Sequence, residues 1–238
     1  MNDIVNKKNK PYIIVETAAD FRQKGEIRTP IERDKKIVLY AGGLYEKFGI
    51  KALLEAIPYI KTPNLEIHLY GEGSFVADII EKQKKVGNLK YKGMVSSQEV
   101  VEREKEATLL INPRPSNEEF TIYSFPSKTI EYMSTGTPVL TTKLKGIPAE
   151  YYDYVFTIEA ETPEGIAEAI DKTLNNSSEV LYSFGARAKE FVCNKKNNLV
   201  QGEITVDFLS RNRKNVTIWA EQLVITQIIW RKYEGEYA

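Results

Sequence analysis

The sequence has one cysteine, Cys193, and one histidine, His68, among its 238 residues. A single cysteine excludes an intramolecular disulfide and is typical of proteins from a reducing compartment. No Cys/His cluster has the spacing of metal ligands, and a Ser-His-Asp triad is not arguable from one histidine in a predicted strand. We therefore expect no metal site, and we interpret His68 as a packed strand residue.

The sequence also lacks net charge, because Lys plus Arg and Asp plus Glu both number 33. This balance argues against nucleic acid as a partner, so any anion must be bound by local geometry. No stretch reaches the ~20 apolar residues of a membrane-spanning helix. The start, MNDIVNKKNKPY, has no apolar core of signal-peptide length. These features predict a cytoplasmic location.

Short runs rich in β-forming residues alternate with helical segments from Lys36 onward. This alternation predicts βαβ units with right-handed crossovers, and hence an α/β fold with a doubly wound parallel sheet. The expected strands are 36–43, 65–73, 89–95, 108–113, 138–143 and 154–158, and the expected helices are 48–60, 74–86, 96–107, 127–135 and one starting at Thr162. Ligands of such sheets bind outside the carboxyl ends of the strands. The loops after residues 43, 73, 95 and 113 are therefore the expected site.

Three local signals fix helix ends within this pattern. Ser96 and Glu99 have the spacing of a capping box. Gly136 is a usual helix stop, and Thr162 precedes a first-turn proline and an acidic residue. These signals predict helix starts at 96 and 162 and a helix end at 136.

The segment Ser124–Lys128 is the candidate phosphate site. A helix N-terminus presents unpaired backbone N–H groups and partial positive charge, which suits a phosphate. The segment adds two hydroxyls, a first-turn proline and the Lys128 ammonium. Glu131 lies on the same helix face and could accept both hydroxyls of a ribose. Spacing alone also allows a capped surface helix with an ordinary Lys–Glu pair worth ~0.2–0.5 kcal/mol.

Residues 123–140, YSFPSKTIEYMSTGTPVL, resemble the nucleotide-sugar signature of retaining GT-B glycosyltransferases. In that signature a helix glutamate is followed by a small residue, Gly-x-Pro-Val and a strand. Other landmarks follow in the family's order: YAGGLYEKFGIKALLEAI, LEIHLYGEGSF, LKYKGMVSSQEV and ATLLINPRP. The resemblance covers about residues 11–210 and implies the Rossmann-like half of a GT-B fold.

The resemblance implies a metal-independent transfer of sugar, with retention, to a polysaccharide or lipid-linked acceptor. The nucleoside diphosphate sugar is then the donor substrate, and no cofactor is expected. Glu131 would hold the ribose, the loop at Gly42 would face the diphosphate, and the strand end at Met94–Val95 would line the base. The expected nucleotide-sugar-binding residues are Gly42, Gly43, Lys47, Met94, Val95, Arg114, Tyr123, Ser124, Phe125, Ser127, Lys128 and Glu131.

The sequence departs from the family at two places. Tyr123 stands where the family usually has a glutamate that contacts the donor sugar, and Glu119 and Lys128 are the candidates for a catalytic role. The family often has Arg and Lys in the loop after the first strand, where this sequence has Gly43 and Phe48. We therefore expect Lys47, Arg114 and Lys128 to supply positive charge to the diphosphate.

The expected organisation has three parts. Residues 1–30 would be a connector from a missing amino-terminal acceptor domain, 31–210 the nucleotide-sugar-binding domain, and 211–238 a divergent tail. Three hypotheses remain open: a donor-binding domain that works with an acceptor domain supplied in trans or lost by truncation, a non-catalytic nucleotide-sugar-binding module, and an inactive fragment. The apolar tail has three interpretations, namely packing on a partner domain, weak peripheral association with the inner face of a membrane, and foreign sequence.

Overall fold

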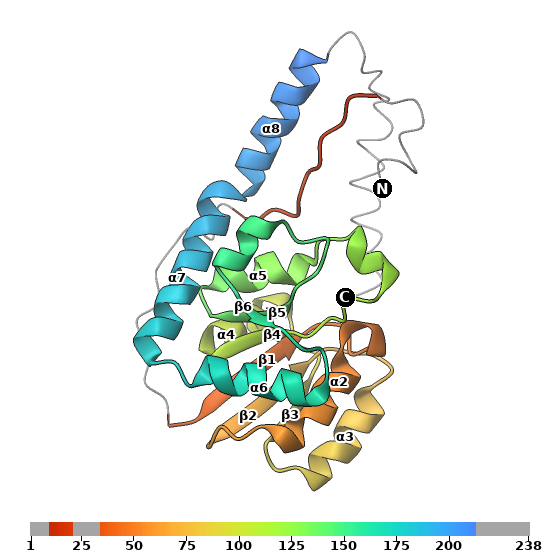
Figure 1. The fold of residues 1–238 in the computed structure, drawn as a ribbon, viewed down its shortest axis with the longest axis vertical. Coiled ribbons are helices and arrows are strands. Elements are labelled where there is room, and N and C mark those ends of the chain that lie inside the picture. The colour runs from red at the N-terminus through yellow and green to blue at the C-terminus, as the bar shows by residue number, and fades with distance from the viewer. Residues whose placement is uncertain (1–9, 21–33, 213–238) are drawn as a thin grey trace. The chain divides into compact units, whose positions relative to one another are not determined.

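The computed structural model describes residues 10–20 and 34–212 (Figure 1). The tail from 213 onward and the segment 21–33 lie outside the described residues. The chain divides into two compact units. The larger, Glu16–Gln201, contains every named strand, and the described residues 10–15 and 202–212 belong to the other.

A parallel sheet forms the centre of the larger unit, in the order β3-β2-β1-β4-β5-β6 (Figure 1). Its strands are β1 Lys36–Ala41, β2 Leu65–Tyr70, β3 Leu89–Gly93, β4 Leu109–Asn112, β5 Val139–Thr142 and β6 Phe156–Ile158. All neighbours pair in parallel, so the predicted doubly wound α/β sheet is confirmed. The strand order reverses between β1 and β4, which makes this the topological switch point.

Helices cover both faces of this sheet. The α-helices are α2 Ile50–Ala56, α3 Val76–Lys85, α4 Ser97–Glu106, α5 Ser127–Thr135, α6 Pro163–Leu174, α7 Ser178–Lys195 and α8 Asn198–Arg211, and the 3-10 helices are η2 Glu46–Phe48, η3 Ile57–Tyr59, η4 Glu119–Ile122 and η5 Ala149–Asp153. One core joins the sheet to α2, α3 and α6, and a second core joins it to α5 and α7. Two separate cores are the expected result of a sheet that is apolar on both faces.

The local signals place the helix ends as predicted. Ser96 Oγ accepts a hydrogen bond from the Glu99 N–H at 3.2 Å, Thr162 Oγ1 accepts one from the Gly165 N–H at 3.1 Å, and Gly136 ends α5 at φ 80°. Two details differ from expectation. The predicted helix 48–60 is divided, because Gly49 at φ 82° separates η2 from α2. Pro126 is the N-cap of α5 and does not lie in its first turn.

Close contact between loops explains the glycines after β2. A Cβ at Gly71 would overlap the Gly42 backbone, and one at Gly73 would overlap the Leu44 backbone. The Gly42 N–H donates to the Tyr70 carbonyl at 3.0 Å, and the Leu44 N–H donates to the Glu72 carbonyl at 2.7 Å. These contacts hold the loop after β1 in place at the carboxyl edge of the sheet.

His68 lies on β2 as the sequence predicts. Its side chain is buried, and Nε2 lies 2.9 Å from Glu66 Oε2. Burial lowers the pKa of His68, and the bond with His68 helps hold the pKa of Glu66 at about 2. The histidine is thus a satisfied packed residue of the sheet.

Candidate functional site

The candidate site begins where β1 and β4 diverge. These strands pair only at Val38 with Leu109 and at Leu39 with Leu110. At the end of β1, the Tyr132 hydroxyl from α5 accepts a hydrogen bond from the Ala41 N–H at 2.8 Å and donates one to the Ala41 carbonyl at 3.1 Å. Tyr132 thus takes the place of a neighbouring strand beside Ala41. The divergence creates the crevice in which doubly wound sheets bind ligands.

The loop after β1 lies directly against the Lys128 side chain. Gly42 has φ 151°, and a Cβ there would overlap Lys128 Cε. Lys128 Nζ lies 5.9 Å from the centroid of the Tyr132 ring. Within ranges 10–20 and 34–212, neither the Lys128 ammonium group nor the Glu131 carboxylate makes a hydrogen bond or ion pair with another side chain. The ordinary Lys–Glu pair is therefore not formed, and both side chains remain available to a ligand.

Arg114, directly after Pro113 at the end of β4, is a half-buried cation between two rings. Its Cζ lies 4.7 Å from the Phe48 ring centroid and 5.3 Å from the Phe120 ring centroid. Its Nε is buried and has no hydrogen-bond partner among the described residues. Burial lowers the pKa of Arg114, and an unpaired buried N–H costs about 1–3 kcal/mol. Lys47 Nζ lies 5.2 Å from the centroid of the same Phe48 ring. Lys47 and Arg114 therefore both lie beside the Phe48 ring, and the unpaired Nε–H of Arg114 could donate a hydrogen bond to an anion.

Ser124 lies in a loop that tertiary contacts hold in place. Its Oγ is buried and is another side-chain atom without a hydrogen-bond partner in the described part of the chain. The Gly146 N–H donates to the Thr121 carbonyl at 3.1 Å, and a Cβ at Gly146 would overlap the Ser124 carbonyl oxygen. The Phe125 ring centroid lies 4.9 Å from that of Tyr151. Residues after β5 therefore fix the loop that leads into α5.

Tyr151 connects this loop to the start of the larger unit. Its hydroxyl donates to Glu16 Oε2 at 2.5 Å, and Lys196 Nζ lies 3.1 Å from the same oxygen. Ala19 forms a parallel bridge with Asn197. Residues 16–20 and the end of α7 thus support the ring on which Phe125 packs.

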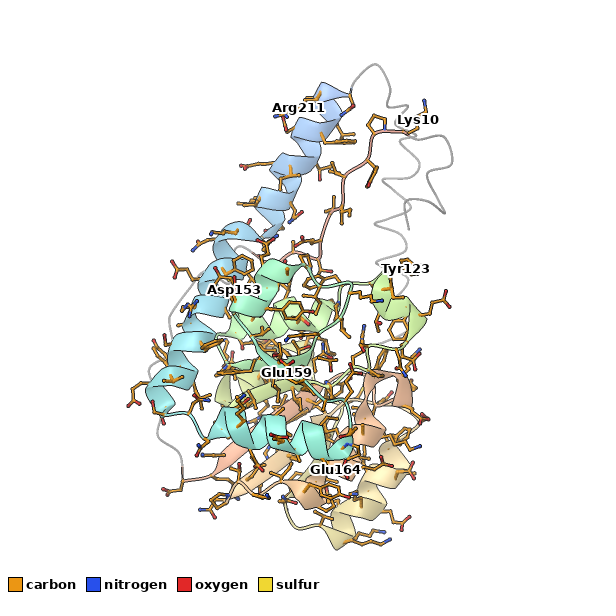
Figure 2. The ribbon with its side chains drawn as sticks, viewed as in Figure 1. Lys10, Tyr123, Asp153, Glu159, Glu164 and Arg211 are labelled. Atoms are coloured by element: carbon orange, nitrogen blue, oxygen red, sulfur yellow. The ribbon has the colours of Figure 1, made fainter. Side chains whose placement is uncertain are left out.

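Several of the other predicted site residues are exposed on the surface. Ser127 is the exposed first residue of α5. Tyr123 is 42% exposed and follows η4 directly (Figure 2), and Glu119 on η4 is also exposed. Met94, at the end of β3, is 53% exposed. The structure therefore groups Gly42, Gly43, Lys47, Arg114 and Lys128 around one loop, and the roles of the other residues remain predictions.

Val95 lines a cavity of about 330 Å³, whose other lining residues lie in or beside β1, β2, β3 and α4. They include His68, Tyr70 and Arg103, and none comes from the loop 42–49. The base-binding role of Val95 remains a prediction.

The sequence interpretation missed two buried residues beside the site, Tyr132 and Glu104. Glu104 on α4 is 0% exposed, and neither of its carboxyl oxygens has a hydrogen-bond partner among the described residues. Burial, and secondarily the charge of Glu131, raises the pKa of Glu104 to about 8. A signal was present, because Glu104 lies four residues after Val100 and three before Ala107, on the apolar face of its helix.

No group of three or more His, Cys, Asp or Glu side chains is placed to hold a metal ion in residues 10–20 and 34–212. Over the same residues, no helix is both long enough and apolar enough to cross a membrane.

Comparison with known proteins adds independent information. The family model described as Glycosyl transferases group 1 matches residues 35–176. No curated protein matches the sequence significantly. A mutant of S. aureus TarM, crystallised with fondaparinux, α-GlcNAc-glycerol and UDP, is similar with a TM-score of 0.65 and 20% identity, over 87% of this chain and 41% of that chain.

Two further structures show different extents of overlap. HepE of Anabaena in complex with UDP has a TM-score of 0.62 and 15% identity, over 75% of this chain and 49% of that chain. The C-terminal domain of a glycosyl transferase group 1 family protein, LpcC from Francisella tularensis, has a TM-score of 0.58 and 16% identity, over 76% of this chain and 100% of that domain. At these identities the likeness establishes the fold. The chain spans half or less of TarM and HepE.

Proposed function

The chain belongs to the glycosyl transferases group 1 family, and from this premise we propose that it binds a nucleoside diphosphate sugar as the donor half of a glycosyltransferase. The carrying observation is that Arg114 Nε, just after β4, and Ser124 Oγ, in the loop that leads into α5, are both buried without hydrogen-bond partners in the described residues. Buried polar groups are normally paired, and an anionic ligand would pair these. HepE of the same fold was crystallised with UDP.

In this proposal the diphosphate binds at the start of α5. No side chain caps this helix at Pro126, so a ligand oxygen could accept hydrogen bonds from its first backbone N–H groups. Lys128 and Arg114 supply positive charge from either end of the loop 42–49. In the reaction these groups would stabilise the leaving diphosphate as negative charge develops on it. Glu131, one turn further, would accept hydrogen bonds from the ribose hydroxyls.

Transfer would proceed with retention to a polysaccharide or lipid-linked acceptor, and it would require an acceptor domain besides this donor half. The need for a second domain is supported by the lengths of TarM and HepE, of which the chain spans 41% and 49%. Such a domain would act on the exposed side of the crevice, where Tyr123 and Glu119 lie at η4.

A second candidate function is a nucleotide-sugar-binding module without transfer activity. Tyr123 favours it, because a phenol replaces the carboxylate that the family usually directs at the donor sugar. Slow release of free sugar from the donor, without acceptor, would separate the two candidates, since a pure binding module does not cleave its ligand.

Thermal unfolding with added UDP, GDP, ADP and CDP tests the proposed site. A ligand that binds only the native state at a concentration of 100 times Kd stabilises it by about 2.7 kcal/mol. Glu131→Ala removes the hydrogen bonds to ribose, and a net loss equal to one bond to a charged acceptor, about 1.5–3 kcal/mol, lowers affinity on the order of ten- to a hundredfold. Glu168→Ala is the control, because Glu168 is an exposed carboxylate on α6.

The proposal fails if none of these nucleotides, at millimolar concentration, raises the unfolding temperature. An unchanged nucleotide affinity in Glu131→Ala would remove Glu131 from the ribose role and leave the diphosphate site standing.

A further inference from the structure

Glu104 is an acidic residue at a fully buried position of α4, where folded proteins usually have an apolar residue. It lies on the face of α4 that packs against α5, is 0% exposed, and has no hydrogen-bond partner for either carboxyl oxygen within the described residues. Its backbone carbonyl is occupied, since it accepts from Thr137 Oγ1 at 2.8 Å. A leucine or methionine would fill the same space without desolvating a carboxyl group, so core packing alone does not explain this residue.

The cations of its own helix are paired elsewhere. Arg103 contacts Glu99 and Glu106, and Lys105 contacts Glu102 at 2.7 Å. These pairs lie on the exposed side of α4, so they supply no counter-ion to Glu104.

The groups that act on Glu104 come from α5 and belong to the proposed site. Burial is the main cause that raises the pKa of Glu104; the charge of Glu131 raises it further, and that of Lys128 lowers it. The buried Tyr132 hydroxyl is engaged with Ala41, and Tyr40 on β1 donates its hydroxyl to the Gly43 carbonyl at 2.9 Å. Neither phenol is thus free to pair with the carboxyl group.

An ionised carboxyl group in this position would be a buried charge without a hydrogen bond, which folded proteins avoid by protonation. The pKa of Glu104, about 8, agrees with a proton at neutral pH. When Glu104 carries a proton, it does not attract the Lys128 ammonium group toward α4. The Lys128 side chain then lies against the loop 42–49.

We propose that Glu104 sets the pH dependence of the donor site, because its buried carboxyl group must be uncharged for Lys128 and Glu131 to bind a nucleoside diphosphate sugar with full affinity. This inference rests on the proposed function. The ligand contacts Lys128 and Glu131. Glu104 does not contact the ligand, and it acts through the effect of its charge on these two residues and on the ligand.

The expected effect follows from charge repulsion. A bound diphosphate places negative charge near Glu104, so it raises the pKa of this carboxyl group further and disfavours its ionisation. By linkage, affinity is constant below the pKa of the free protein and falls as pH rises through it. For an ionised Glu104 about 10 Å from one phosphate charge, an effective dielectric constant of about 20–40 gives roughly four- to fifteenfold weaker binding.

Isothermal titration calorimetry with UDP-glucose between pH 6.5 and 9.5 tests this inference. The phosphates of this ligand do not titrate in that range, and the uracil N3–H, which ionises near pH 9.5, is the same for every variant, so differences between variants come from the protein. Wild type and the control Glu102→Gln, an exposed carboxylate of the same helix, should bind progressively more weakly above pH 8. Glu104→Gln and Glu104→Met should match wild type at pH 7 and should weaken less than wild type between pH 8 and pH 9.

Proton uptake provides a readout that a merely structural role would not change. At pH 8, binding to wild type should take up protons, measured from the heats in two buffers of different ionisation enthalpy. Glu104→Gln should take up none from this source. If the Gln variant fails to fold, the Met variant of nearly the same volume provides the same comparison.

The possible outcomes are distinguishable. If Glu104→Gln retains the wild-type weakening and proton uptake, the role of Glu104 is refuted while the donor site stands. If folded wild type binds neither UDP-glucose nor any of the four nucleoside diphosphates at pH 7, the proposed function is refuted, and this role with it.

Discussion

Replacing Tyr132 with phenylalanine removes one oxygen atom from the place where the sheet divides. That hydroxyl is the hydrogen-bond partner of both the N–H and the carbonyl of Ala41, because β4 has already diverged from β1 at this position. Tyr132 is 0% exposed, so water cannot replace the lost partner. The substitution leaves the ring in place and changes only the hydrogen bonding.

The magnitude follows from the two groups left unpaired. A buried N–H or carbonyl without a partner costs about 1–3 kcal/mol, and backbone relaxation recovers part of that cost. We expect the free energy of unfolding to fall by about 2–4 kcal/mol. Because Gly42 follows Ala41 directly and contacts Lys128, nucleotide affinity should fall as well.

The chain contains a matched control in Tyr152. Its hydroxyl also makes two bonds to one residue, accepting from the Leu144 N–H at 2.8 Å and donating to the Leu144 carbonyl at 2.9 Å. Tyr152 is half-buried and its two bonds to Leu144 are only partly buried, so solvent can replace part of the lost bonding, and Tyr152→Phe should cost about 0.5–1.5 kcal/mol. Urea unfolding at constant m-value measures both. If Tyr152→Phe costs as much as Tyr132→Phe, burial does not set the cost and the reasoning is wrong.

Three further predictions concern the loops and charges of the site. Gly146→Ala should destabilise the fold by about 1–3 kcal/mol in urea unfolding and weaken nucleotide binding, because the new methyl group overlaps the Ser124 carbonyl oxygen. Arg114→Lys should weaken nucleotide binding in calorimetry by about tenfold and change stability little, since an ammonium group lacks the planar fork of N–H groups. Because the native pKa of Glu104 lies near 8 and its ordinary value is 4.5, the stability from this residue is full below pH 4.5 and is lost as pH rises to 8, by at most about 5 kcal/mol at 1.36 kcal/mol per pH unit. Glu104→Gln loses none of this stability, so its free energy of unfolding should rise relative to wild type between pH 4.5 and 8 and keep a constant difference above pH 8.

Most of the fold was predictable because its signals are local. Alternating strand and helix periods specify a parallel sheet, and capping residues mark helix starts, as at Ser96 and Thr162. The break at Gly49 was not predicted, because its cause is distant in sequence: a Cβ at Gly49 would overlap the Pro113 carbonyl oxygen at the end of β4. The exact strand ends likewise depend on where β1 and β4 separate.

The part of the candidate site that lies within one short segment could be predicted from the sequence. Ser124, Lys128 and Glu131 are close in sequence, and helix geometry places the last two on one face. Tyr132 and Ala41 are 91 residues apart, and only packing of α5 against the sheet brings them together. Glu104 could have been flagged as an acid on an apolar helix face, but its neighbours Lys128 and Glu131 belong to another helix.

The charge of the site explains how a chain with no net charge could hold a diphosphate. Lys47, Arg114 and Lys128 contribute three positive charges, and Glu131 contributes one negative charge, which leaves two positive charges for the two negative charges of a nucleotide sugar. An ionised Glu104 would reduce that excess to one and would do so inside the protein, where water screens charge poorly. A protonated carboxyl group at Glu104 keeps the balance matched to the ligand. The proton on this buried residue would therefore set how strongly the proposed site holds its ligand as pH changes.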